Sequence, residues 1–158
     1  MSDFSVRPIG KISIGQEGMF VKLAPQYIPA LKALDGFSYI NVLWWFSKFD
    51  NDEARSVLDT PKPYKTSPET VGIFATRSPV RPNPIALSAA QVLEIDHENG
   101  IIRIAYIDAD DNTPVLDIKP YTPSLDRVEI PEVPDWCSHW PTNVETSGDF
   151  DWENEFNF

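Results

Sequence analysis

The chain has 158 residues, 42% of them hydrophobic, and a formal net charge of −11. This length and composition allow one sizeable hydrophobic core. No apolar run is long enough to span a membrane, and the first ten residues lack the features of a signal peptide, so we expect a cytoplasmic protein with no membrane partner. Cys137 is the only cysteine and there are two histidines, which excludes an internal disulfide and argues against a metal site.

Alternation of apolar and polar residues dominates the beginning of the chain. It predicts strands over residues 6–14 and 19–23, the first of them near a sheet edge because Pro8 interrupts it. Residues 29–34 can form one helical turn. The longest predicted strand covers residues 38–49 and has apolar side chains on both faces, which indicates burial on both sides or a contact between subunits.

The middle of the chain mixes polar connections with further strands. Asn51 is placed to cap a short helix over residues 52–57. The predictions that follow are a polar connector at 60–70, a short strand at Ile73 and Phe74, and a β-hairpin from 85–95, the turn 96–100 and 101–107. The strand spacing favours an all-β barrel or sandwich with one or two short helices. A Gly-rich loop of the kind that opens a Rossmann cofactor site is absent from the sequence.

Residues 72–87, GIFATRSPVRPNPIAL, have the composition of a preformed binding loop. Their three prolines fix φ and remove backbone donors, so the loop cannot join a helix or a central ladder. A stiff loop loses little entropy on ordering, and it can therefore hold Arg77, Arg81 and Asn83 in place before a ligand arrives. A guanidinium in such a loop can clamp a carboxylate or a phosphate. Asn83 has a second interpretation, in which it only satisfies backbone groups of the turn.

Residues 108–121, DADDNTPVLDIKPY, are the second dense stretch. Three carboxylates and a turn lead into a strand over residues 115–118. Asp117 and Lys119 are two apart on this strand and share a face, either as a structural ion pair or as part of a site. Tyr121 is either a stacking surface or a core aromatic residue.

Three segments in order, FSYINVLWWF at 37–46, GIFATRSPVRPNPIALS at 72–88 and DNTPVLDIKPY at 111–121, resemble the TsaA-like (TrmO, formerly YaeB) family. The resemblance covers most of residues 6–125. It implies a β pseudo-barrel that binds S-adenosylmethionine (AdoMet) and forms a homodimer with the cofactor near the interface. The activity that it implies is N6-methylation of threonylcarbamoyladenosine next to the tRNA anticodon.

The resemblance also implies roles for individual residues. The predicted cofactor contacts are Arg77, Leu87, Ser47, Asp108 and Asp110. Arg77 would clamp the methionine carboxylate and Leu87 would form an apolar wall for the adenine, although Leu87 is also suited to the core. The two aspartates would bind ribose hydroxyls or the ammonium group, or they are turn carboxylates. Arg81 and Asn83 are the predicted substrate contacts.

Methyl transfer from a sulfonium needs positioning, removal of water, and one group that accepts a proton. Asp117, Lys119 and Tyr121 are the predicted catalytic residues. We expect Asp117 to act as hydrogen-bond acceptor or base, and Lys119 to tune it or to touch phosphate. No metal and no Ser or Cys nucleophile is required.

The chain departs from the family pattern in several places. The usual Pro-Arg-Gln loop is shortened to a turn in which only Gln16 is available, and the two usual histidines are replaced by Tyr39 and Ser47. Ala86 and Asn112 replace glycines, and Asn112 tolerates a positive φ better than most residues. These changes leave a second reading open, in which the protein is a ligand-binding module or a methyltransferase with a non-tRNA acceptor.

The end of the chain differs in composition from the rest. Residues 129–158 contain eight acids and no Lys or Arg, and residues 1–128 hold 16 acids and 13 bases, a net charge of −3. The near-neutral charge of residues 1–128 is compatible with tRNA binding by a local basic patch, but it does not by itself predict such binding. We expect a TsaA-like barrel domain over 1–128 and an acidic, aromatic extension over 129–158 that packs on the barrel or is partly disordered.

Overall fold

The structure is a computed structural model that describes residues 2–158. It contains two compact units, and each brings together two segments of the chain. The first unit runs up to Lys48 and includes Ile85–Arg127, and the second combines Phe49–Pro84 with Val128–Phe158. Our division of the chain at residue 128, and the packing of the extension on the barrel, stay predictions.

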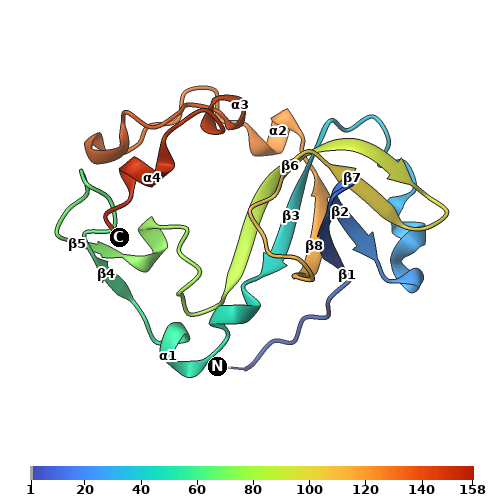
Figure 1. The fold of residues 1–158 in the computed structure, drawn as a ribbon, viewed down its shortest axis with the longest axis horizontal. Coiled ribbons are helices and arrows are strands. Elements are labelled where there is room, and N and C mark those ends of the chain that lie inside the picture. The colour runs from blue at the N-terminus through green and yellow to red at the C-terminus, as the bar shows by residue number, and fades with distance from the viewer. Residues whose placement is uncertain (1) are drawn as a thin grey trace. The chain divides into compact units, whose positions relative to one another are not determined.

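The first unit is a closed antiparallel β-barrel, as predicted (Figure 1). Around the barrel the strands follow the order β1 (Gly10–Gly15), β2 (Gly18–Leu23), β7 (Ile101–Ile104), β6 (Ile85–Asp96), β3 (Tyr39–Trp45) and β8 (Pro114–Pro120). The barrel closes where β8 pairs with β1, with Gly10 opposite Val115. Closing the sheet into a barrel is one of the ways in which a small antiparallel sheet limits its exposed edges.

The core of the barrel follows the two-residue period of its strands. On β3, Ile40, Val42 and Trp44 are buried, whereas the residues between them are half-buried. The Trp44 indole donates a hydrogen bond to Ser88 Oγ at 3.0 Å, so its polar N–H is satisfied in the core. The apolar residues on both faces of this strand therefore have different environments: one face fills the barrel and the other lies on its outside.

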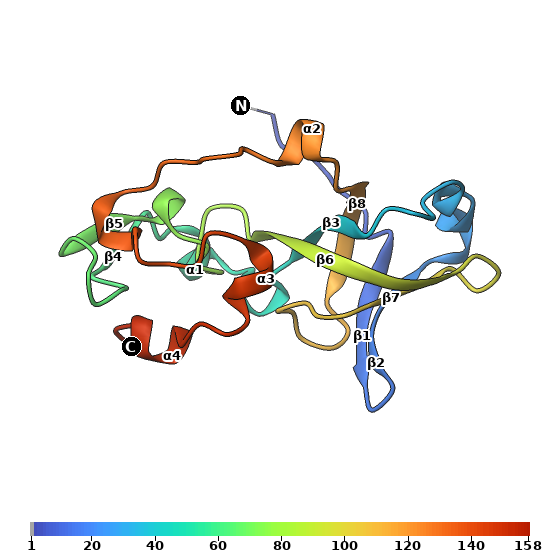
Figure 2. The same cartoon turned by 90° about the horizontal axis from the view of Figure 1, so that it is seen from above.

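The predicted strands are confirmed with shifted ends. β2 and the hairpin β6–β7 lie where the sequence predicted them (Figure 2). The first strand begins only at Gly10, after Pro8, which has no N–H to donate to a ladder. The longest predicted strand ends at Trp45, and the 3₁₀ helix η2 (Ser47–Phe49) follows it. The predicted helical turn at 29–34 is the 3₁₀ helix η1 (Pro25–Leu31), which begins at a proline.

The second unit consists of short elements and turns. They are α1 (Asp52–Arg55), β4 (Asp59–Pro61), β5 (Thr70–Gly72), η3 (Ile73–Ala75), η4 (Asp135–Cys137), α3 (Val144–Ser147) and α4 (Trp152–Glu155), while α2 (Pro123–Asp126) belongs to the barrel unit. Asn51 caps α1 as predicted, because its Oδ1 accepts from Ala54 N at 2.9 Å. None of the helices within residues 2–158 has the length and apolar character that crossing a bilayer requires.

Two predictions for the second unit were wrong. The connector at 60–70 is flanked by the antiparallel pair β4–β5, so its ends belong to a small sheet. Ile73 and Phe74 form a 3₁₀ turn and no strand. The reason lies in Thr76, whose backbone N–H and hydroxyl both donate to the carbonyl of Ile73, at 3.0 and 2.8 Å, and bend the chain there.

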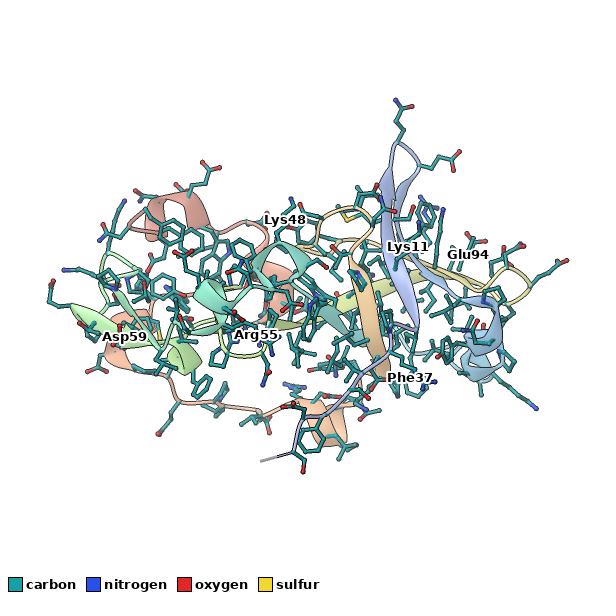
Figure 3. All side chains as sticks on the ribbon, turned by 90° about the horizontal axis from the view of Figure 1, so that it is seen from below. Lys11, Phe37, Lys48, Arg55, Asp59 and Glu94 are labelled. Carbon is teal, nitrogen blue, oxygen red and sulfur yellow. The ribbon has the colours of Figure 1, made fainter. Side chains whose placement is uncertain are left out.

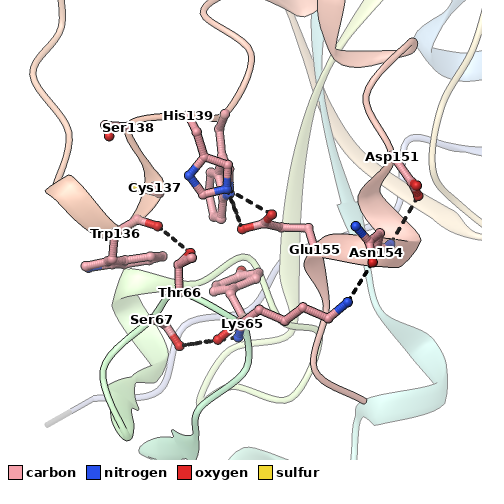
Figure 4. A network of polar contacts seen from close by, with 12 residues as sticks. Lys65, Thr66, Ser67, Trp136, Cys137, Ser138, His139, Asp151, Asn154 and Glu155 are labelled. Carbon is pink, nitrogen blue, oxygen red and sulfur yellow. Dashed lines mark hydrogen bonds and ion pairs between the residues drawn. The ribbon is translucent and has the colours of Figure 1, made fainter.

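The C-terminal segment is held within the second unit by an aromatic cluster. Its rings come from Tyr64, Trp136, Trp140, Phe150, Trp152 and Phe156, with neighbouring centroids between 4.7 and 6.3 Å apart. Among them lies Glu155, 8% exposed, whose carboxylate accepts from Trp140 Nε1 at 2.7 Å and pairs with His139 Nε2 at 2.9 Å (Figure 4). Thus a buried carboxylate with two partners sits in the middle of this small core.

Replacing Glu155 with alanine is expected to destabilise the second unit by about 1–3 kcal/mol, because Trp140 and His139 lose their acceptor where water reaches poorly. Urea unfolding followed by tryptophan fluorescence measures the change. Glu153→Ala, an exposed position on the same α4, is the matched control and is expected to stay close to wild type. Equal loss of stability in both variants would contradict the role of Glu155.

The same carboxylate gives the second unit a defined acid sensitivity. Burial by itself raises the pKa of Glu155, but hydrogen bonds from Trp140 and His139 outweigh it, and the pKa is lowered. Because the folded-state pKa lies below the unfolded one, the stabilisation is present above the unfolded pKa of about 4.3 and is lost as the pH falls through the lowered value. Glu155→Gln is expected to flatten this acid-dependent loss in the same unfolding measurement.

Candidate functional site

The loop that follows η3 is ordered by its own side chains. Ser78 N donates to Thr76 Oγ1 and Val80 N donates to Ser78 Oγ, both at 3.2 Å. Thr76 is buried and Pro84 is fully buried, so both ends of the loop are anchored in the second unit. The sequence-based prediction of a stiff, preformed loop agrees with these contacts.

The two loop arginines have different environments. Arg81 is half-buried, and its Nη1 donates to the carbonyl oxygens of Thr76 and Ser78 at 3.2 Å each, which closes the loop on itself. Arg77 is exposed at the start of the loop. Arg81 thus supports the backbone that carries Arg77, and the ligand contacts of both arginines stay predictions.

Arg55 holds the second half of this loop, and sequence reasoning missed it. From the end of α1, its Nε donates to the Pro82 carbonyl at 2.9 Å and its Nη2 to Asn83 Oδ1 at 3.1 Å. Its Nη1 also pairs with Asp50 at 2.9 Å. The only sequence signal was an arginine one turn after the Asn51 cap, which gave no hint of the loop that it reaches.

In the first unit, Asp117 and Lys119 meet on β8 as predicted. Asp117 Oδ2 and Lys119 Nζ are 2.8 Å apart, and their side chains are 48% and 64% exposed. The hydrogen bond to Asp117 and the attraction between the charges raise the pKa of Lys119, so the ammonium stays protonated at neutral pH. Both side chains are therefore partly exposed to solvent.

A register shift in the β3–β8 ladder lies beside this pair. Leu43 pairs with Asp117 but Trp44 pairs with Val115, so one residue of β8 is extra. Such bulges bend a strand and re-aim the neighbouring side chain, and they are frequent next to active sites. Asp117 Oδ1 also accepts from the N–H of Ile118 at 2.9 Å, which fixes the carboxylate.

The remaining predicted cofactor contacts also lie in the first unit. Asp110 pairs with Lys48 at 2.8 Å. Lys48, labelled in Figure 3, follows the exposed Ser47 in the chain. Asp108 is exposed, and Leu87 is 48% exposed on β6, so Leu87 does not belong to the core. Lys48 is a second residue that sequence reasoning missed, although its place next to Ser47 was a usable signal.

The third carboxylate of the 108–111 run is structural. Asp111 Oδ1 accepts from the N–H of Ile14 at 2.8 Å, which ties the loop before β8 to β1. Next to it, Asn112 has φ of 64°, and its side chain accepts from Lys11 Nζ at 2.9 Å. Asn112 thus adopts a left-handed backbone conformation at a position where the family pattern has glycine.

Tyr121 lies just beyond β8 and is half-buried. Its ring meets Tyr39 edge-on with centroids 6.3 Å apart, and its N–H donates to the Tyr39 carbonyl at 3.0 Å. The residue is therefore neither a fully buried core aromatic nor a free stacking platform. Its catalytic role stays a prediction.

The structure thus gathers the predicted site residues into two sets. The barrel unit carries Ser47, Leu87, Asp108, Asp110, Asp117, Lys119 and Tyr121, and the second unit carries Arg77, Arg81 and Asn83. Within residues 2–158, no three His, Cys, Asp or Glu side chains are grouped so that they could hold a metal ion. The guanidinium donors suit an amino-acid carboxylate, and the carboxylate acceptors suit an ammonium group and ribose hydroxyls.

These features define a small closed β-barrel protein in which the polar residues predicted to form the site lie on loops and on β8. The sequence match is more specific: the chain belongs to the tRNA-methyltransferase O N-terminal domain family, which it matches over residues 6–127. The resemblance inferred from its motifs is therefore confirmed.

Relatives and solved structures agree with this family. The chain is 36% identical over 108 residues to an S-adenosyl-L-methionine-binding protein of Archaeoglobus fulgidus, covering 68% of this chain and 72% of that protein. It is 34% identical over 127 residues to a probable S-adenosyl-L-methionine-binding protein of Methanocaldococcus jannaschii, covering 80% and 99%. Its similarity to the tRNA (adenine(37)-N6)-methyltransferase of Escherichia coli is 34% over 96 residues, 60% of this chain and 40% of the enzyme.

A crystal structure of TrmO from Pseudomonas aeruginosa has the same fold. The TM-score is 0.63 at 27% identity, and the match covers 83% of this chain and 62% of that one. A second TrmO structure matches with a TM-score of 0.65 and 28% identity, covering 84% and 64%. The chain therefore spans less than two thirds of the solved TrmO chains.

Proposed function

We propose that this protein is an AdoMet-dependent methyltransferase that methylates N6 of threonylcarbamoyladenosine next to the tRNA anticodon. The observation that carries the proposal is the match to the tRNA-methyltransferase O family over residues 6–127, with the Arg77 loop held in a preformed conformation. Relatives named for AdoMet binding support the cofactor, and relatives named as tRNA methyltransferases support the acceptor.

The residues fit AdoMet by their chemistry. Arg77 offers a planar guanidinium for the methionine carboxylate, and Leu87 offers exposed apolar surface for the adenine. Asp108 and Asp110 offer acceptors for ribose hydroxyls or the ammonium group, with Ser47 as a further hydroxyl. When bound, AdoMet supplies an activated methyl group whose leaving group departs neutral.

The protein's own contribution is then positioning and removal of one proton. Holding two reactants in line can contribute about 7–11 kcal/mol to lowering the barrier. Asp117 is the group that accepts the proton of the acceptor nitrogen, and the bond from Ile118 N–H keeps one of its oxygens in place. Lys119, protonated beside it, orients the carboxylate and offers a cation to a phosphate. Tyr121 lies at the end of the same strand.

Recognition of tRNA is assigned to Arg81 and Asn83 together with Lys119. The near-neutral charge of residues 1–128 means that binding rests on such local contacts and on base recognition more than on a broad basic surface. A steep loss of affinity with salt is therefore not expected for this protein.

The two halves of the proposal are tested separately. Calorimetric titration with AdoMet tests the cofactor, and absence of binding would refute the enzyme assignment. Mass spectrometry of nucleosides from tRNA of a strain lacking the protein tests the acceptor, with complementation by the wild-type chain as control. Unchanged N6-methylation in that strain, with no second protein of the family present, would refute the acceptor alone.

The second candidate function is a binding module without turnover, or a methyltransferase for another acceptor. The observation that favours it is the short β1–β2 turn, in which Gln16 and Glu17 join the strands where other family members carry a longer loop. Methyl transfer to tRNA by the purified protein would exclude this reading. Binding of AdoMet without transfer to any tRNA or extracted small molecule would favour it.

The protein is also proposed to be a homodimer. On the outside of the barrel, Trp45 lies opposite Ile85 and Leu43 opposite Leu87, which makes a row of apolar side chains, and Ile85 and Leu87 are 40% and 48% exposed. Apolar rows of this kind are typical of subunit contacts. Light scattering at micromolar concentration is expected to give twice the 17.9 kDa chain mass, and Ile85→Glu is expected to give the monomer. A wild-type monomer would contradict the proposal.

A further inference from the structure

We propose that Arg55 is the positioning residue of the loop 76–84, which holds the loop's second half in its ligand-binding conformation; the inference rests on the proposed function. Three prolines deprive the loop of backbone donors, so its shape depends on side chains. Its first half is held by Thr76, Ser78 and Arg81 from within the loop. Its second half receives its hydrogen bonds from Arg55.

All three nitrogen atoms of the Arg55 guanidinium donate hydrogen bonds. Nε donates to the Pro82 carbonyl, Nη2 to Asn83 Oδ1 and Nη1 to Asp50 Oδ1, at 2.9, 3.1 and 2.9 Å. Three acceptors that lie in different directions match the fixed directions of the arginine N–H groups. A lysine ammonium cannot reach all three. The side chain is 38% exposed, so these bonds are partly shielded from water.

The helix α1, which carries Arg55, is itself held in place. Asn51 caps α1 through Ala54 N, and Ala54 is buried, which anchors this single turn in the second unit. Arg55 N donates to the Asn51 carbonyl at 3.0 Å. The chain of contacts therefore runs from a capped turn, through one guanidinium, to the segment that carries Asn83. A displacement of about 1 Å in a positioning contact can reduce the reaction rate 100-fold. The hydrogen bonds from Arg55 are therefore expected to affect both ligand binding and methyl transfer.

Two measurements on Arg55→Lys and Arg55→Gln test this role. Backbone 15N order parameters of Arg81 and Asn83 report loop order without any ligand, and the order parameter of Val71 in β5 reports the order of the same unit. We expect the order parameters of Arg81 and Asn83 to fall from about 0.85 to below about 0.6, that of Val71 to stay unchanged, and the tRNA dissociation constant to rise about tenfold, because Asn83 is a proposed tRNA contact. Lys62→Gln, which removes a comparable ion pair with Glu69 in the same unit, is expected to change neither quantity.

The outcomes separate the two claims. Unchanged order parameters of the loop in Arg55→Lys would overturn the positioning role, and so would lowered order parameters with unchanged tRNA affinity, because Arg55 would then be only structural. If Arg55→Gln does not fold, the test rests on Arg55→Lys alone, which keeps the positive charge beside Asp50. A wild-type protein that binds no AdoMet would overturn the proposed function, while the order parameters would still decide whether Arg55 orders the loop.

Discussion

Replacing Arg77 with alanine is expected to weaken AdoMet binding by about 1.5–3 kcal/mol, the range for a hydrogen bond to a charged group. The reason is the loss of the guanidinium that we propose to clamp the methionine carboxylate from a preformed loop. Since Thr76, Ser78 and Arg81 order that loop by their own contacts, we expect the fold to persist in the variant. Calorimetric titration gives the affinity and thermal unfolding gives the stability.

Two matched variants sharpen this experiment. Arg77→Lys keeps the charge but loses the planar fork, so an intermediate affinity is expected. Arg103→Ala removes an exposed arginine from β7, outside the candidate site, and is expected to leave AdoMet affinity unchanged. Affinity that is equal in Arg77→Ala and wild type would show that the loop does not bind the cofactor.

Asp117→Asn is expected to lower the rate of methyl transfer by about 100- to 10,000-fold, the usual contribution of a positioned general base. Asparagine keeps the size and one carbonyl oxygen of the side chain but cannot accept the proton. Because Asp117 and Lys119 form an exposed pair, the free energy of unfolding should change by less than about 1 kcal/mol. Single-turnover transfer to tRNA with bound AdoMet measures the chemical step.

Asp35→Asn is the control for this variant. Asp35 belongs to another exposed pair of the barrel unit, with His97 Nε2 at 2.8 Å, and lies outside the candidate site. We expect it to retain the wild-type rate. A rate for Asp117→Asn within a factor of about three of wild type would assign the proton to another acceptor, and Tyr121→Phe would be the next variant.

The sequence alone predicted what depends on neighbouring residues. The alternation of apolar and polar residues correctly predicted β2 and the hairpin β6–β7. Successive side chains of a strand point to opposite faces, so this pattern depends only on local backbone geometry. The cap at Asn51 was also predicted correctly, since it depends on one residue and the few residues beside it. The ordered motifs were enough to identify the family.

The tertiary structure alone decided which distant residues meet. The closure of β8 on β1, the extra residue in β8 beside Asp117, and the burial of Glu155 among the aromatic rings depend on partners far along the chain. Arg55 reaches Asn83 across 28 residues, and no local period encodes such a contact. Hydrogen bonds of this kind depend on where folding brings the backbone. The bonds from Arg55 to the candidate binding loop could therefore be identified only from the tertiary structure.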